Sequence, residues 1–133
     1  MKPKWWNKGK THLYKRDKVM RKLLIAYKGH LTTRNNFFYS LTRSIISQQI
    51  SVSAADSVFS KFEKKCKGKI NPKIVSHLTI TDLRRCGLSR MKALGIKSLA
   101  DKILDKSFNP KLIKKMSDEE AINYLSSLRQ IGR

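Results

Sequence analysis

The chain has 133 residues, enough for one domain that buries a core of its own without disulfides or a structural metal. Thirty Lys and Arg residues against nine Asp and Glu give a formal net charge of +21, which indicates a polyanionic partner. No stretch approaches the length of a transmembrane helix and the first residues contain no apolar signal segment, so neither membrane insertion nor secretion is indicated.

Nucleic acid is the polyanion that best explains this charge. Lysine and arginine side chains bind phosphates with release of counterions, so the affinity should fall steeply as salt rises. Two other uses of a basic surface stay open: binding to an anionic membrane or another protein, and simple solubilisation of the fold by lysine. Competition between DNA and anionic liposomes would separate membrane binding from nucleic-acid binding.

The cysteines and histidines give no sign of a metal site. Cys66 and Cys86 are far apart and lack the paired C-x-x-C spacing of a zinc or redox site, so we interpret both as reduced thiols of a cytoplasmic protein. His12, His30 and His77 have no carboxylate or cysteine at ligand spacing. We therefore expect neither a metal nor another cofactor.

The first segment, residues 1–14, is basic and shows no sustained apolar periodicity, so we expect an irregular arm. Trp5 and Trp6 within it are expected to anchor the arm on the protein, and stacking on an exposed base is the alternative. From Arg16 onward apolar residues recur at helical spacing, and Gly29 is a typical helix stop. The pattern predicts an amphipathic helix with an apolar face of Val19, Met20, Leu23, Leu24 and Tyr27.

The next two predicted helices are joined by a short polar turn. Residues 37–46 carry a broad apolar face and run directly into the polar residues 47–51. Ser51 or Ser53 is a suitable N-cap for the helix that follows, which ends at Gly68. The apolar face of that helix consists of Ala54, Ala55, Val58, Phe59 and Phe62.

The rest of the chain contains several patterns that are typical of helix starts. Asparagine precedes proline at 71–72 and at 109–110, Thr79 is followed by Asp82, and Ser89 precedes a long apolar-periodic segment. Residues 117–120 match a capping box in front of the last helix. Because no segment alternates with period two, we expect an all-α fold: a compact bundle of about seven or eight short helices, with residues 15–133 as one helical domain.

The segment around the polar turn resembles a known protein family. Residues 37–56 read FFYSLTRSIISQQISVSAAD, which is similar to the helix-hairpin-helix superfamily of DNA glycosylases and, within it, to the DNA-3-methyladenine glycosylase II group. Further similar segments follow in order: Gly87-Leu88-Ser89 with Lys92, and LRQIGR at residues 128–133, which looks like the opening of the hairpin itself. The resemblance extends from residue 13 to the end and implies the helical fold of that superfamily, here incomplete.

The resemblance implies a DNA-contacting role for the turn. A glycosylase must extrude its target nucleotide, so it needs a side chain that fills the gap left in the base stack. Gln49 matches the position where the family presents this wedge, and its amide can hydrogen-bond the orphaned base. Gln48 and Ser51 are expected to order the turn or to face the base pocket. The alternative is that all three residues only cap and bridge helix ends.

The end of the chain resembles the hairpin that holds DNA phosphates in this family. A Gly-rich turn lets backbone N–H groups approach a phosphate at the start of a helix. Gly132 matches one hairpin glycine and Arg133 follows it, so both are expected to contact DNA, whereas Gln130 stands where the family usually has another glycine. The family's catalytic Asp follows the hairpin, and no residue of this chain matches it.

Together these features predict a base-excision repair glycosylase that removes alkylated purines, present as a fragment truncated inside the hairpin and inactive by itself. Its expected partner is damaged double-stranded DNA at the nucleoid, in the cytoplasm, and the complete enzyme is expected to be a monomer. The alternative is a non-catalytic, basic helical nucleic-acid-binding protein. Truncation is expected to expose the apolar faces of Leu41, Ile45 and Phe59 and so to make the domain marginally stable and prone to aggregate.

Overall fold

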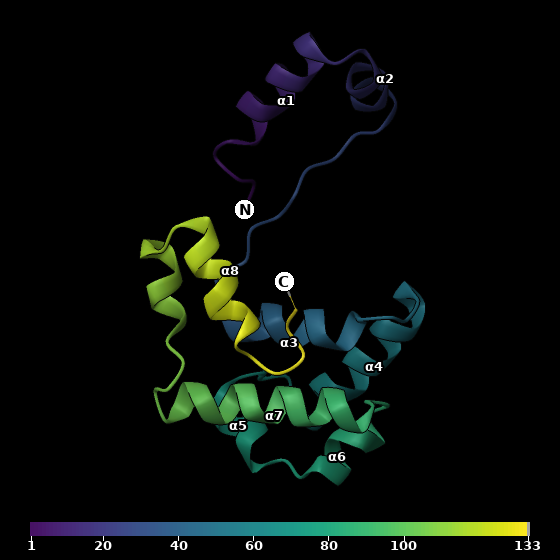
Figure 1. Ribbon diagram of the computed structural model, residues 1–133. Coiled ribbons are helices and arrows are strands. Elements are labelled where there is room, and N and C mark those ends of the chain that lie inside the picture. The colour runs from purple at the N-terminus through teal and green to yellow at the C-terminus, as the bar shows by residue number, and fades with distance from the viewer. Residues whose placement is uncertain (133) are drawn as a thin grey trace. The chain divides into compact units, whose positions relative to one another are not determined.

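The computed structural model describes residues 1–132, which contain eight α-helices, one 3-10 helix and no strand (Figure 1). The all-α prediction is therefore confirmed. The residues form two compact units by their contacts, Met1–Asn35 and a second unit that begins at Asn36. The predicted boundary after residue 14 differs from this division. Among the described residues, no helix is both long and apolar enough to cross a membrane.

The N-terminal unit consists of two helices, α1 (Trp6–Arg16) and α2 (Lys18–Ala26). The predicted amphipathic helix is present as α2, but the irregular arm predicted for residues 1–14 is wrong, because most of that segment belongs to α1. Lysine and arginine are good helix formers even without an apolar stripe. In addition, Arg21 of α2 donates hydrogen bonds to the carbonyl oxygens of Tyr14 and Lys15 at the end of α1, at 2.8 and 3.3 Å.

Apolar side chains of the N-terminal unit remain largely exposed. Neither α1 nor α2 contributes a buried residue, and Val19 and Tyr27 of the predicted apolar face are 68% and 73% exposed. Trp5 is 61% exposed and its ring centroid lies 6.0 Å from that of Trp6, so Trp5 is not buried within its own unit. Anchoring of this segment on the rest of the protein stays a prediction. The unit is held by local hydrogen bonds rather than by a core.

The second unit begins with the predicted helix pair and is organised around one long helix. That helix, α7 (Arg90–Leu104), packs on α3, α5 and α6 (Figure 1). The other elements are α3 (Phe37–Ser47), α4 (Val52–Lys65), α5 (Pro72–His77), α6 (Ile80–Arg85), the 3-10 helix η1 (Pro110–Lys115) and α8 (Asp118–Ser126).

The predicted helix starts are confirmed by their capping hydrogen bonds. Ser51, not Ser53, caps α4 by accepting from the backbone N–H of Ala54. Thr79 and Ser117 form capping boxes with the carboxylates of Asp82 and Glu120. Each cap satisfies backbone donors that a helix otherwise leaves without partners. The remaining predicted caps, all observed, are Asn71, Ser89 and Asn109.

The hydrophobic core lies entirely in the second unit. The expected exposure of the Leu41, Ile45 and Phe59 faces is wrong for the last two, because Ile45 is 0% and Phe59 5% exposed, while Leu41 is half-buried. Packing of α3 against α4 and α7 covers these faces within the chain itself. The largest fully buried side chains are those of Phe62, Ile45, Ile46, Leu83, Ile96 and Val75.

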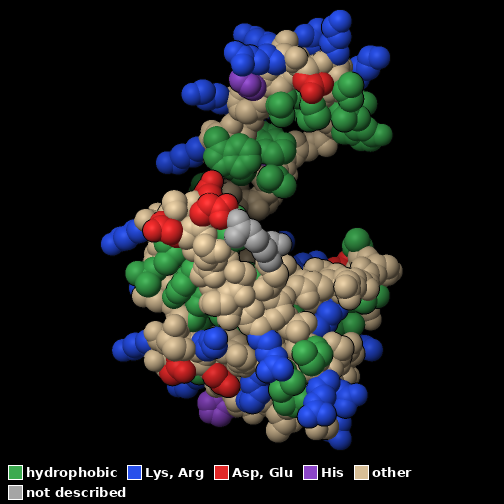
Figure 2. Space-filling model, in the orientation of Figure 1, with side chains coloured by type: hydrophobic (Ala, Val, Ile, Leu, Met, Phe, Trp, Pro, Cys, Tyr) green, Lys and Arg blue, Asp and Glu red, His purple; other side chains and the backbone are tan. Residues whose placement is uncertain are grey.

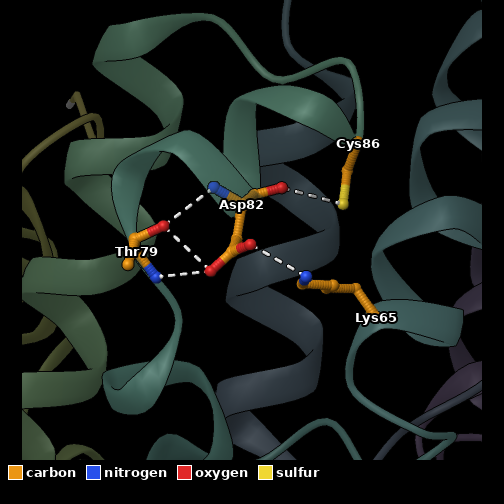
Figure 3. A network of polar contacts seen from close by, with 4 residues as sticks. All are labelled: Lys65, Thr79, Asp82 and Cys86. Carbon is orange, nitrogen blue, oxygen red and sulfur yellow. Dashed lines mark hydrogen bonds and ion pairs between the residues drawn. The ribbon is translucent and has the colours of Figure 1, made fainter.

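A network of polar contacts joins α4 to the start of α6 (Figure 3). The Lys65 ammonium lies 2.8 Å from one carboxylate oxygen of Asp82, and the other oxygen accepts hydrogen bonds from the backbone N–H and the hydroxyl of Thr79 at 3.0 and 2.8 Å. The bond from Lys65, followed by those from Thr79, lowers the pKa of Asp82 well below its usual range. The network therefore depends on the charged form of the carboxylate.

Substitution Asp82→Asn is expected to lower stability only at pH values where the carboxylate is charged. A group whose pKa falls on folding stabilises the protein above its unfolded pKa, about 3.9 for Asp, and this contribution disappears as the pH falls toward the folded value. Urea titrations should give a difference between wild type and D82N that is constant from about pH 7 to 5 and shrinks below about pH 4. An undiminished difference at about pH 3 would contradict this account.

Candidate DNA interface

The turn between α3 and α4 presents Gln49 to solvent. Helix α3 ends at Ser47, Gln48 is its C-cap, and α4 begins after Ser51. Gln49 is exposed and has a φ of 55°, in the left-handed region that few non-glycine residues occupy. A non-glycine residue keeps this strained backbone conformation only where contacts with its surroundings hold it there.

Lys92 of α7 supplies part of that support. Its ammonium donates hydrogen bonds to the backbone carbonyl oxygens of Ile46 and Gln48, at 2.8 and 2.7 Å. The last carbonyls of a helix have no partner within it, and a cation at this end is also favoured by the helix dipole. Lys92 therefore fixes the end of α3 from which the turn departs.

Helix α7 repeats this arrangement five residues further along, at Lys97. The ammonium of Lys97 donates to the carbonyl oxygens of Ser76 and Leu78, at 2.6 and 3.0 Å, at the end of α5. The two lysines thus make the same kind of contact with two different helices, and only that of Lys92 adjoins the turn with Gln49. Lys97 is for this reason a natural control for Lys92.

Gln48 connects the turn to the C-terminal segment. Its side-chain amide donates a hydrogen bond of 2.7 Å to the backbone carbonyl oxygen of Gln130. Gln130 itself has a φ of 68° and lies directly on α7 at Gly95, where a Cβ atom would come within 2.7 Å of the Gln130 side chain and 3.3 Å of the Arg129 carbonyl oxygen. Only glycine at position 95 accommodates this close approach.

The structure thus brings together Gln48, Gln49 and Ser51 but describes little of the predicted hairpin. Ser51 caps α4, which is the role that the alternative interpretation assigned to it, and its hydroxyl also lies 3.2 Å from that of Ser53. Gly132 is exposed, and a Cβ atom there would meet nothing within 4 Å. Arg133 lies outside the described residues.

Neither cysteine has the character of a reactive group. Both are buried free thiols. Burial raises the pKa of Cys66 to about 11 and raises that of Cys86, so both stay protonated at neutral pH. Among residues 1–132, no three His, Cys, Asp or Glu side chains are grouped so that they could hold a metal ion.

The contacts of three residues on α7 could not be predicted from the sequence. Lys92 is recognisable only as part of a segment similar to the family, without a role, and Gly95 and Lys97 carry no local signal at all. Their contacts reach carbonyls and side chains that are 19 to 46 residues away in the chain. A short-range pattern of apolar or capping residues contains no information about such contacts.

Comparison with known proteins decides the family. Residues 42–131, which include the Gln48–Gln49 turn and Gln130, match the model of the HhH-GPD superfamily base excision DNA repair proteins. The chain belongs to this superfamily. The match begins within α3 and runs through the end of α8.

One curated relative and two solved structures agree with this membership. The alkylbase DNA glycosidase-like protein mag2 of Schizosaccharomyces pombe is 31% identical over 100 residues, which is 72% of this chain and 47% of mag2. The structure of the S. pombe 3-methyladenine DNA glycosylase Mag1 in complex with abasic DNA is 25% identical with a TM-score of 0.81, over 95% of this chain and 65% of that one. The 3-methyladenine DNA-glycosylase from Archaeoglobus fulgidus is 27% identical with a TM-score of 0.73, over 92% and 45%.

The superfamily member described here spans about half the length of the curated relatives it matches, 47% and 43%. The likeness to Mag1 and to the archaeal enzyme confirms the predicted fold, a helix-hairpin-helix glycosylase architecture, over almost the whole of this chain.

Proposed function

We propose that the protein binds damaged double-stranded DNA as a base-excision glycosylase of the DNA-3-methyladenine glycosylase II type, with Gln49 as the side chain that enters the base stack. The observation that carries the proposal is the turn itself. Gln49 is exposed in a left-handed conformation, and the residue before it, Gln48, is held through its carbonyl by Lys92 and through its side-chain amide by Gln130. A side chain that displaces a base must be both exposed and rigidly held, because ordering a flexible residue on binding would cost free energy.

Release of the flipped base is proposed to need a catalytic carboxylate, and the acidic residues of this chain do not provide one. Asp82 and Glu120 belong to capping boxes, Asp17 caps α2, and Asp56 pairs with Arg43 at 2.7 Å. Each of these four carboxylates already has a structural partner, and by the resemblance none of the nine acidic residues of the chain matches the family's catalytic Asp. The proposed activity of this chain by itself is therefore recognition of the lesion at the nucleoid DNA, without base release.

Binding to a duplex that contains an abasic analogue tests the role of Gln49. Wild type is expected to bind this duplex more tightly than the intact duplex of the same sequence, and Gln49→Ala should lower the ratio of the two affinities by about tenfold, equivalent to about 1.4 kcal/mol. Ser60→Ala, an exposed substitution on α4 away from the turn, is the control and should leave the ratio unchanged. Equal ratios for wild type and Gln49→Ala would overturn the wedge role.

A second assay concerns the chemistry. Duplexes that contain 3-methyladenine or hypoxanthine are incubated with the protein, and released base is measured. No release is expected, and release above background would overturn the proposal that recognition occurs without turnover. Salt-sensitive binding with no preference for the abasic duplex would instead favour the non-catalytic nucleic-acid-binding alternative, which the net charge of +21 supports.

A further inference from the structure

The positive charge of the protein is concentrated in the N-terminal unit. Residues 1–35 contain eleven Lys and Arg against one carboxylate, a net charge of +10, whereas the remaining 98 residues carry +11. Figure 2 shows Lys and Arg side chains projecting along the edge of this unit, with hydrophobic side chains gathered elsewhere on its surface. A charge density this high has no explanation in the fold, since like charges repel one another in the absence of a counter-charge.

The N-terminal unit is folded rather than an unstructured basic tail. Its ends are joined by hydrogen bonds from the N–H and hydroxyl of Thr33 to the carbonyl oxygen of Met1, both at 2.7 Å. Its single carboxylate, Asp17, is occupied by the backbone N–H groups of Val19 and Met20 at 2.8 and 2.9 Å. No acidic side chain of the unit is therefore left to neutralise its lysines and arginines.

One face of α1 gathers cations and hydrogen-bond donors into a shallow groove. Positions that differ by four and by one or three residues share a face of a helix, and the exposed groove is lined by Asn7, Lys8, Thr11, His12, Lys15 and Arg16. No apolar and no acidic side chain lines it. Within residues 1–132, Lys8, Lys15 and Arg16 take part in no ion pair.

We propose that this groove on α1 is a second DNA-contact surface, which binds the phosphate backbone of duplex DNA without regard to sequence or damage. Nine residues of helix extend about 13 Å, and duplex DNA carries one negative charge for about every 1.7 Å of its axis, so the three cations can each meet a phosphate. Asn7 and Thr11 add donors of the kind that proteins place on phosphate oxygens.

The groove fits DNA better than a membrane surface. A helix that lies in a membrane interface inserts its apolar side chains, and the exposed apolar side chains of α1, Leu13 and Tyr14, lie outside this groove. The inference rests on the proposed function only for the identity of the polyanion as duplex DNA. It requires neither Gln49 nor a lesion.

The salt dependence of binding to intact duplex DNA tests the proposal. The full chain with Lys8→Gln, Lys15→Gln and Arg16→Gln is compared with a matched control, Lys111→Gln, Lys114→Gln and Lys115→Gln on η1, which removes the same charge from exposed positions of the second unit. The slope of log K against log[salt] should fall by about 2.7 for the α1 variant, about 0.9 for each lost phosphate contact, and by less than half of this for the control. Circular dichroism verifies that both variants retain their helices.

Two outcomes would overturn the inference. One is an equal change of slope in the two triple variants. The other is an α1 variant that binds DNA like wild type but no longer binds vesicles of anionic phospholipid, which would identify a membrane surface as the partner. The α1 variant should leave the ratio of abasic to intact affinity unchanged, whereas Gln49→Ala should change that ratio and leave the salt slope unchanged. Failure of one proposal is thereby distinguishable from failure of the other.

Discussion

Substitution Phe62→Ala is expected to lower the free energy of unfolding of the second unit by about 3–5 kcal/mol. Phe62 lies on α4 and is 0% exposed, and its ring lies beside that of Phe59, with centroids 6.3 Å apart. Removal of a buried ring loses its transfer free energy and leaves a cavity that the surrounding helices can only partly fill. Since domains are typically stable by about 5–15 kcal/mol, the loss is large enough to unfold a substantial fraction of the protein.

Equilibrium urea denaturation followed by circular dichroism measures this effect. Val52→Ala on the same helix is the control, because Val52 is 78% exposed and its truncation should change stability by no more than about 0.5 kcal/mol. A loss below about 1 kcal/mol for Phe62→Ala would show that the core around α4 is not packed as described.

Substitution Lys92→Met is expected to weaken both stability and recognition of the abasic duplex. Methionine keeps most of the apolar stem but removes both hydrogen bonds to the carbonyl oxygens of Ile46 and Gln48, at a cost of about 1–3 kcal/mol. Because the Gln48–Gln49 turn leaves α3 at this point, the preference for abasic over intact DNA should fall severalfold, with little change in binding to intact DNA.

Lys97→Met separates the two effects. It removes an equivalent pair of hydrogen bonds, to Ser76 and Leu78, and is expected to cost a similar amount of stability. It should leave the abasic preference intact, because α5 does not adjoin the turn. If the two variants lower that preference equally, Lys92 acts through general stability and not by positioning Gln49.

The parts of the fold that sequence could predict depend on short-range chemistry. Caps such as Ser51 and Ser117 bind backbone groups three residues away, so the pattern that predicts them also contains their partners. Helix α1 was missed because it lacks an apolar stripe, and its stabilisation comes from helix propensity and from Arg21 in the next helix. The burial of Ile45 and Phe59 likewise depends on how helices pack, which periodicity does not specify.

In the candidate site, too, the sequence predicts the residues of the turn but not the distant residues that hold the turn. The resemblance singled out Gln48 and Gln49, and the structure places the second on an exposed turn. What holds that turn is distant in sequence: the hydrogen bond from Gln48 crosses 82 residues to reach Gln130, and those of Lys92 cross 44 and 46. Such partners follow only from the packing of α7 against α3.

The close approach of Gln130 to Gly95 limits which substitutions at these two positions are compatible with the fold. Gln130 adopts a left-handed conformation, and its side chain lies against α7 at Gly95. Positions 95 and 130 therefore form a pair with complementary sizes: the long side chain at one is compatible with the fold only while the other has none. A mutation that enlarges residue 95 is tolerated only in a genetic background where residue 130 has already become small, so the order in which the two changes arise decides whether either survives.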